Sequence, residues 1–178
     1  MDRKKLIDKK KNPFYKHAEM ELFLAEKNGE IVGRIGAIIN HNHNKEHKEN
    51  IGFFGFFESI NNQEVANALF DAAKKYLQSK NVTAIRGPAS PSVNDEYGLL
   101  INAFDKSPVV LMPYNLEYYP TLVENYGFTK IKDLYSYLLT QDTVYSEKMV
   151  RFNDLVRKKE GLTFRSLNMK DFFNEIKR

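Results

Sequence analysis

Residues 51–80 read IGFFGFFESINNQEVANALFDAAKKYLQSK, and this stretch decides the fold. Its first part, Ile51 to Phe57, is almost continuously apolar and rich in aromatics, which predicts a short strand covered on both faces. Apolar residues then recur at helical spacing from Val65 to Leu77, which predicts an amphipathic helix. Asn61, with Glu64 three residues later, is typical of a helix N-cap. The stretch therefore predicts a strand, a polar turn and a helix packed on the strand.

The composition is that of a globular protein, because 42% of the 178 residues are hydrophobic. The chain has no cysteine, which excludes disulfides, thiolate metal sites and a cysteine nucleophile. No apolar run approaches the roughly 20 residues of a membrane span, and no signal-peptide pattern opens the chain. We therefore expect a cytoplasmic protein that does not bind a membrane. The mild net charge of +4 and the absence of interleaved aromatics favour a solvated, lysine-rich leader over a nucleic-acid-binding arm.

A hairpin is expected before this stretch. Glu21–Glu26 and Glu30–Ile39 have the character of strands, and Asn28-Gly29 between them is a strong signal for a two-residue turn. We expect these two strands and Ile51–Glu58 to be sequential antiparallel neighbours.

Three histidines follow the hairpin, in the polar segment 40–50. His41, His43 and His47 have a spacing that would suit zinc, since neutral imidazoles are common zinc ligands. The segment is rich in lysine, however, and no carboxylate spacing supports a metal site. The sequence favours a solvated loop and leaves zinc binding and contact with a substrate as alternatives.

The rest of the chain contains shorter elements. We expect a long, functional loop from Ser90 to Asp105. The other expected elements are strands at Val82–Arg86, Phe128–Ile131, Leu134–Leu139 and Leu162–Leu167, and helices at Glu117–Asn125, Ser146–Lys159 and from Asn168 onwards.

Several stretches resemble the GNAT-type acyl-CoA N-acyltransferase superfamily. LFLAEKNGEIVGRIGAII (22–39) looks like its second and third strands, and ENYGFTKIKDLYSYLL (124–139) like its helix end and last hairpin. The pattern GFFGFFE…QEVANALFDAA…RGPASPSVNDEYGLL…MPYN…YYPTL looks closest to a bacterial GNAT-like family of longer proteins. The resemblance implies an α/β (α+β) fold with a mixed, mostly antiparallel sheet flanked by helices. It divides the chain into a basic leader (1–20), a GNAT-like domain (21–140) and a tail (141–178) that begins a possible second unit.

The resemblance also implies a reaction, the transfer of an acetyl or acyl group from acetyl-CoA or another acyl-CoA to a small-molecule or peptide amine. Glu58 at the end of the central strand is the candidate general base, and Tyr119 is the candidate acid for the departing thiolate. The residues expected to bind the cosubstrate are Phe57, Glu58, Ser59, Asn61, Asn62, Gln63 and Glu64. The positions of four other residues, and not the resemblance, predict contact with the amine. Asn94 and Glu96 lie in the long loop, and Tyr114 and Asn115 follow a short apolar run, where open sheets place ligands.

Two positions depart from the superfamily. The turn that usually carries glycines for the pyrophosphate has none here and has Glu64 instead, and Val123 stands where a tyrosine is usual. Each candidate residue also has a structural interpretation: Glu58 as a strand-terminal surface acid, and Asn94 to Glu96 as turn residues. Two other functions therefore stay open, a non-catalytic GNAT-fold module that binds a ligand or partner, and a relative of the peptide or aminoacyl ligases.

The tail predicts an association. Leu162 to Arg178 resembles the start of a second such unit, and Phe172, Phe173 and Ile176 have few partners within it. Exposed aromatic side chains of this size are unfavourable in a complete domain. We expect either that the tail covers an edge of the body or that it pairs with another chain as a homodimer.

Overall fold

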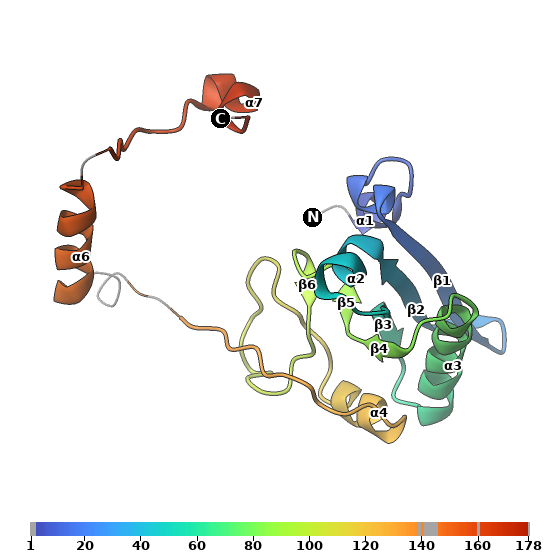
Figure 1. Cartoon of the computed structure of the whole chain (residues 1–178). Coiled ribbons are helices and arrows are strands. Elements are labelled where there is room, and N and C mark those ends of the chain that lie inside the picture. The colour runs from blue at the N-terminus through green and yellow to red at the C-terminus, as the bar shows by residue number, and fades with distance from the viewer. Residues whose placement is uncertain (1–2, 139, 141–145, 160, 178) are drawn as a thin grey trace. The chain divides into compact units, whose positions relative to one another are not determined.

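The computed structural model describes residues 3–138, 140, 146–159 and 161–177 (Figure 1). The chain divides into two units, Met1–Asp133 and Leu134–Arg178. The first contains the sheet and the second a few separate helices, and each is described by itself.

The first unit is built on a four-stranded sheet in the order β1-β2-β3-β4. The strands are β1 (Ala18–Lys27), β2 (Glu30–Asn40), β3 (Ile51–Ser59) and β4 (Ala84–Arg86). The first three are antiparallel neighbours, as the sequence predicts, and β4 is parallel to β3. Asn28 and Gly29 both have positive φ, 54° and 83°, which the tight turn between β1 and β2 requires. The predicted fold class, a mixed and mostly antiparallel sheet with flanking helices, is confirmed.

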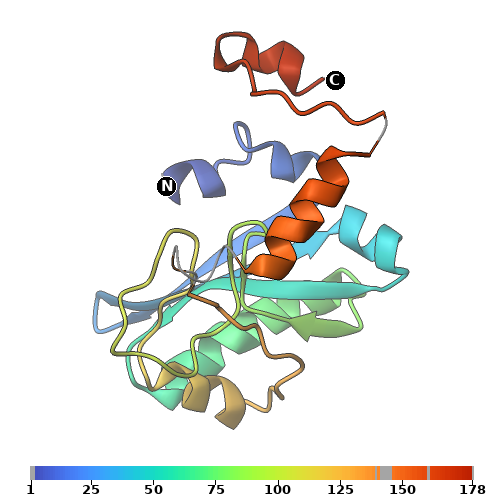
Figure 2. The same cartoon turned by 90° about the vertical axis from the view of Figure 1, so that its left-hand side faces the viewer.

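Both faces of the sheet are covered at β3 (Figure 2). The helix α3 (Gln63–Ser79) packs on one face through Leu69, Phe70 and other buried side chains of its apolar stripe. The 3₁₀ helix η1 (Pro13–Lys16) contributes Phe14 and Tyr15 to the other face. Of the four phenylalanines of β3, Phe53, Phe54 and Phe57 are buried and Phe56 is half-buried, so the predicted two-sided burial is confirmed.

The N-cap of α3 is one residue later than expected. The side chain of Asn62, whose φ of −148° is extended, accepts the amide hydrogen of Val65. Asn61 is exposed and is not the cap. Two adjacent asparagines offer the same side-chain oxygen, and the backbone direction at the end of β3 decides which of them the helix uses.

Strand β3 changes neighbours along one edge. Its first part pairs with β4 through Ile51, Gly52 and Phe53. Beyond this the edge faces the short strand β5 (Ala89–Ser90), and the amide of Phe56 donates to Oγ of Ser90 at 2.8 Å. Phe56 has a φ of 52° and lies at a register shift between β2 and β3. This bulge interrupts the pairing of β3 with β2, which resumes at Glu58 and Ser59.

Four elements complete the first unit: α1 (Arg3–Ile7), α2 (His41–His47), β6 (Glu96–Tyr97) and α4 (Tyr119–Asn125). Strand β6 pairs with β5 in a separate two-stranded sheet. The expected loop at 40–50 is wrong in part, because α2 forms there with its N-terminus capped by the Asn40 side chain. Asn40 ends β2 and begins the helix, a local signal that the polar composition concealed.

The expected strands at Phe128–Ile131 and Leu134–Leu139 are not present in residues 128–138, and Leu139 lies outside the described residues. Ile131, Tyr135 and Tyr137 are at least 75% exposed. Alternating apolar residues predict one face of a strand, but a strand also needs a neighbour for its backbone hydrogen bonds. No neighbouring strand pairs with these residues in the described part of the chain.

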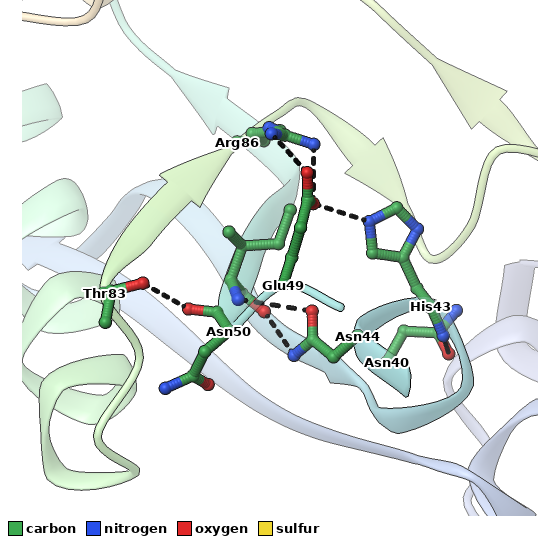
Figure 3. Close-up of polar contacts among 8 residues, drawn as sticks. Asn40, His43, Asn44, Glu49, Asn50, Thr83 and Arg86 are labelled. Carbon is green, nitrogen blue, oxygen red and sulfur yellow. Dashed lines mark hydrogen bonds and ion pairs between the residues drawn. The ribbon is translucent and has the colours of Figure 1, made fainter. Parts of the chain in front are cut away.

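A polar cluster connects α2 and β4 to the beginning of β3 (Figure 3). Arg86 donates two hydrogen bonds to the carboxylate of Glu49, at 2.9 and 3.0 Å, and the His43 ring lies 3.3 Å from the same carboxylate. The side chain of Asn44 donates to the backbone carbonyl of Ile51 and accepts a hydrogen bond from the backbone amide of Ile51. The cluster therefore holds the entry of β3 between two neighbouring elements.

We expect the Glu49→Gln variant to melt at a lower temperature than the parent at pH 7. Hydrogen bonding from Arg86, and secondarily from His43, holds the pKa of Glu49 below its ordinary value of 4.5. A carboxyl group whose pKa is lower in the folded protein stabilises the folded state at pH values above its pKa in the unfolded chain. This contribution is lost as the pH falls through the pKa of the folded state. The difference in melting temperature should thus shrink as the pH falls below 4.5, the ordinary pKa of this carboxyl group. Glu46→Gln, an exposed change on α2, is the control; a difference that is independent of pH would contradict the prediction.

The second unit contains α6 (Glu147–Arg157), η2 (Met169–Asp171) and α7 (Phe172–Glu175). Ser146 and Asn168 cap α6 and η2, in agreement with the helices expected there. The expected strand at Leu162–Leu167 is wrong, because these residues pair with no other strand in the described chain. Phe172, Phe173 and Ile176 are 41%, 76% and 60% exposed, and the expected homodimer stays a prediction. None of the helices described is long and apolar enough to cross a membrane.

Candidate functional site

A small cavity of about 70 Å³ opens at the carboxyl end of β3. It is large enough for a few water molecules. Its lining comes from β2, β3, the long loop after β4 and the start of α4, and it includes Arg34, Glu58, Glu96, Tyr114, Asn115 and Tyr119. Both residues predicted as catalytic and three of the four predicted to face the substrate thus meet in one place.

Glu58 and Tyr119 are in direct contact. The Tyr119 hydroxyl donates to Oε2 of Glu58 at 2.6 Å and accepts the backbone amide of Ser59 at 3.3 Å. Tyr119 is 4% exposed, whereas the Glu58 side chain is half exposed, so the pair has one buried and one open member. Burial, with the hydrogen bond to Glu58 next, raises the pKa of the Tyr119 phenol well above its usual range. The phenol is therefore protonated at neutral pH and available as a donor.

The neighbouring tyrosine fixes the same turn. The Tyr118 hydroxyl donates to the carbonyl of Ser59 at 2.8 Å. Together the two tyrosines bind both backbone groups of Ser59, one through its amide and the other through its carbonyl. This arrangement holds the end of β3, and with it Glu58, against the start of α4.

Arg34 is a site residue that the sequence did not single out. Its Nη2 lies 3.5 Å from Oε1 of Glu58, and its Nε is buried with no hydrogen-bond partner in the described structure. Arg34 on β2 lies directly opposite Glu58 on β3 in the register of the sheet. The antiparallel register of the two predicted strands places Arg34 opposite Glu58, and this register could have identified Arg34 from the sequence.

The turn before α3 has a different character from the cavity. Asn61 and Glu64 are exposed, and the Asn62 side chain is used as the helix cap. The Gln63 side chain bonds Asn67 and the carbonyl of Leu122, so it connects α3 to α4 instead of facing outward. Of these four predicted cosubstrate residues, Gln63 and Glu64 can offer a ligand their backbone amides, since the first amides of a helix have no acceptor within it. The backbone amide of Asn62 instead donates to the carbonyl of Ile60.

The side chain of Phe57 is part of the core, where it stacks on Phe70 at a centroid distance of 4.7 Å. The Ser59 side chain is also buried and donates to the carbonyl of Ile60. The side chains of these two predicted residues therefore have structural partners, and both backbone groups of Ser59 are bound by Tyr118 and Tyr119.

The four predicted substrate residues differ in position. Glu96 and Tyr114 line the cavity, and Tyr114 is 58% exposed. Asn115 lines it too, but its side chain is buried and bonds both backbone groups of Leu100. Asn94 does not line the cavity; it is exposed and lies in a turn, where its amide donates to the Ser92 hydroxyl.

The histidines have structural contacts. The ring of His41 contacts Glu19 at 3.0 Å, while His43 contacts Glu49 and lies beside the ring of His47. Within the described residues, no group of three or more side chains is arranged to hold a metal ion.

The chain is similar to two bacterial proteins. It is 36% identical over 167 residues to Protein YghO of Escherichia coli (strain K12), and the aligned region covers 93% of this chain and 42% of that protein. It is 38% identical over 138 residues to a bacterial ceramide synthase of Caulobacter vibrioides (strain NA1000 / CB15N), and the aligned region covers 77% of this chain and 36% of that protein. The chain thus spans less than half the length of the curated relatives it matches. No protein-family model and no solved structure matches it.

Proposed function

We propose that this chain contributes an N-acyltransferase site that transfers an acyl group from an acyl-CoA to an amine. The observation that carries the proposal is the hydrogen bond of 2.6 Å between the Tyr119 hydroxyl and the Glu58 carboxylate at the mouth of the cavity. It joins a proton acceptor to a protonated donor, the two groups that acyl transfer to an amine requires. The relative named as a ceramide synthase supports acyl transfer, because a ceramide is the N-acylated form of a long-chain amino alcohol.

The arrangement of the strands supports a GNAT-like version of this reaction. Three sequential antiparallel strands are followed by α3 and then by β4, which is parallel to β3 and leaves it after Phe53. The bulge at Phe56 lies beyond the end of this pairing and beside β5, whose Ser90 hydroxyl accepts the Phe56 amide. In the superfamily that the sequence resembles, backbone amides at a splay in the central strand bind the pantetheine arm and polarise the thioester carbonyl.

The mechanism assigns one proton transfer to each residue. Glu58 accepts the proton that the amine loses as its nitrogen bonds to the acyl carbon. Tyr119 gives its hydroxyl proton to the sulfur as the carbon–sulfur bond breaks, and recovers a proton from Glu58 across their hydrogen bond. Arg34, next to the other oxygen of Glu58, balances its negative charge between turnovers. The products are an amide and free CoA, and both residues return to their starting states.

The residues at the start of α3 fit a phosphate only in part. The backbone amides of Gln63 and Glu64 lie in the first turn of a helix, where anions bind favourably. The carboxylate of Glu64 opposes this, because it places a negative charge in the same turn. We propose that an acyl-CoA binds here through backbone amides and with moderate affinity.

Acetyl-CoA should bind the full chain in isothermal titration, and Glu64→Gln should bind it about two- to fivefold more tightly. Removing a charge from the first turn of a helix changes the interaction with an anion by about 0.3–1 kcal/mol. Glu46→Gln on α2 removes an exposed charge from another helix and should leave the affinity unchanged. Equal or weaker binding by Glu64→Gln would show that the pyrophosphate lies elsewhere.

A second candidate function is a non-catalytic module of the same fold that binds a ligand or a partner. The observation that favours it is the turn from Ser59 to Glu64, which has no glycine and which carries a carboxylate. No detectable binding of acetyl-CoA or of a longer acyl-CoA by the parent chain would support this candidate over the transferase.

A further inference from the structure

A serine hydroxyl connects the bulge in β3 to the cavity. Ser90 on β5 is 8% exposed and lines the cavity, and its Oγ accepts the backbone amide of Phe56 at 2.8 Å. Gly55 permits this close approach, because a β-carbon at position 55 would lie 3.1 Å from the same Oγ. The amide of Phe56 therefore has its acceptor within the chain, and what this part of the cavity offers a ligand is the serine hydroxyl.

The Ser90 hydroxyl has a hydrogen left to donate. A serine hydroxyl donates one hydrogen bond and can accept two. Its oxygen accepts the Phe56 amide, and its hydrogen has no acceptor among the residues that the structure describes. Accepting the amide makes the hydroxyl a stronger donor, since hydrogen bonds in a chain polarise one another. Ser90 thus gives the cavity a buried and polarised donor.

A second donor lies across β3 from the first. Arg34 on β2 is opposite Glu58, whereas Ser90 on β5 is beside Phe56 at the other edge of the strand. The Nε of Arg34 is buried and has no hydrogen-bond partner in the described part of the chain. Both residues line the same cavity, together with Glu58. Since buried donors in folded proteins are normally paired, these two are suited to an oxygen atom of a ligand.

We propose that Ser90 and Arg34 form an oxyanion hole, in which the Ser90 hydroxyl and the Arg34 Nε donate to the carbonyl oxygen of the acyl group. This rests on the proposed function, since it assigns two donors to the same reaction. As the lone pair of the amine nitrogen bonds to the acyl carbon, one electron pair of the carbonyl moves to its oxygen. The two hydrogen bonds stabilise the negative charge, and neither donor gives up its proton. The pair returns as the carbon–sulfur bond breaks, and the sulfur takes the proton of Tyr119.

The first test is the infrared band of the thioester carbonyl, measured with isotope-labelled acetyl-CoA bound to the full chain in the absence of an amine. Hydrogen bonds to the oxygen weaken the carbonyl bond, so the band should lie at a lower wavenumber than that of free acetyl-CoA. Ser90→Ala should move the band back toward the free value, which the loss of a purely structural contact would not do. Ser92→Ala, in the same loop but outside the cavity lining, is the matched control and should keep the band of the parent.

A second variant covers the case in which Ser90→Ala fails to fold. Arg34→Lys keeps a positive charge near Glu58 but has no donor at the Nε position. It should also move the carbonyl band toward the free value, by removing the other of the two hydrogen bonds.

The second test is the rate of acyl transfer. Ser90→Ala should lower kcat about 10²- to 10³-fold, the usual cost of losing one oxyanion donor, with little change in KM. A parent band at the free value, a band that neither variant moves, or an unchanged kcat for Ser90→Ala would overturn the proposal even in a chain that transfers acyl groups. A lowered band in a parent that never acylates an amine would support the oxyanion hole and contradict the proposed reaction. No binding of acetyl-CoA would overturn both.

Discussion

Replacing Glu58 by glutamine should lower the rate of acyl transfer by about 10²- to 10⁴-fold, the usual contribution of a general base. Glutamine keeps an oxygen that can accept the Tyr119 hydroxyl but cannot take a proton from the amine. The fold should persist, because the Glu58 side chain is half exposed. The turnover number should fall while the affinity for the acyl donor, which we place at the backbone amides of α3, changes little.

The control for this variant is Glu26→Gln, which removes an exposed carboxylate near the β1–β2 turn, outside the residues that line the cavity. It should transfer acyl groups at the rate of the parent. Steady-state rates from the release of free thiol, with melting curves of both variants, make the comparison. Equal rates for Glu58→Gln and the parent would remove Glu58 from the chemistry and leave it as a structural partner of Tyr119.

Replacing Gly55 by alanine should unfold the first unit or destabilise it by about 4 kcal/mol or more, among the largest effects of a single substitution. A β-carbon at position 55 would lie 1.7 Å from the carbonyl oxygen of Ala89 and 2.6 Å from its carbon. Both are backbone atoms, so the methyl group can be accommodated only if β5 moves away from β3. Such a movement would also break the hydrogen bond from the Phe56 amide to Ser90.

The matched change is Gly36→Ala, also in the sheet, where the nearest atoms belong to the side chains of Phe56 and Leu22 at 3.1 and 3.2 Å. Side chains can rotate, so this variant should differ from the parent by about 1 kcal/mol at most. Urea unfolding followed by circular dichroism compares the two. If their midpoints coincide, the close packing of β5 against β3 is not a determinant of the fold.

The sequence predicted the elements whose signals are local. Asn28-Gly29 fixes a tight turn by its own backbone preferences, and the apolar run of β3 followed by the stripe of α3 needs no knowledge of the rest of the chain. The same reasoning failed between Phe128 and Leu138, where alternating residues predicted strands. Alternation describes the faces of a strand, but a neighbour must satisfy its backbone, and that information lies elsewhere in the chain.

The candidate site was predicted only in part, because some of its contacts join residues that lie far apart in the chain. Glu58 was predicted because it ends a recognisable strand, and Tyr114 because it follows a short apolar run. Tyr119 was predicted with the help of the resemblance. Their convergence, and the contact between Glu58 and Tyr119, depend on the loop of 90–118 folding back to the end of β3. The bulge at Phe56 and the Nε of Arg34, which has no hydrogen-bond partner among the described residues, depend on register and burial, which no spacing of residue types encodes.

Acyl transfer by this chain is tested by the mass of the product after the full chain is incubated with an acyl-CoA and a primary amine. Chemistry at the Glu58–Tyr119 pair predicts the amide of the two substrates, together with one free thiol for each amide formed. The same mixture with Glu58→Gln should contain amide only at the level of the reaction without protein. If the parent chain binds acyl-CoA and amine but releases them unchanged, the cavity is a binding site without acyl transfer, and the account is wrong.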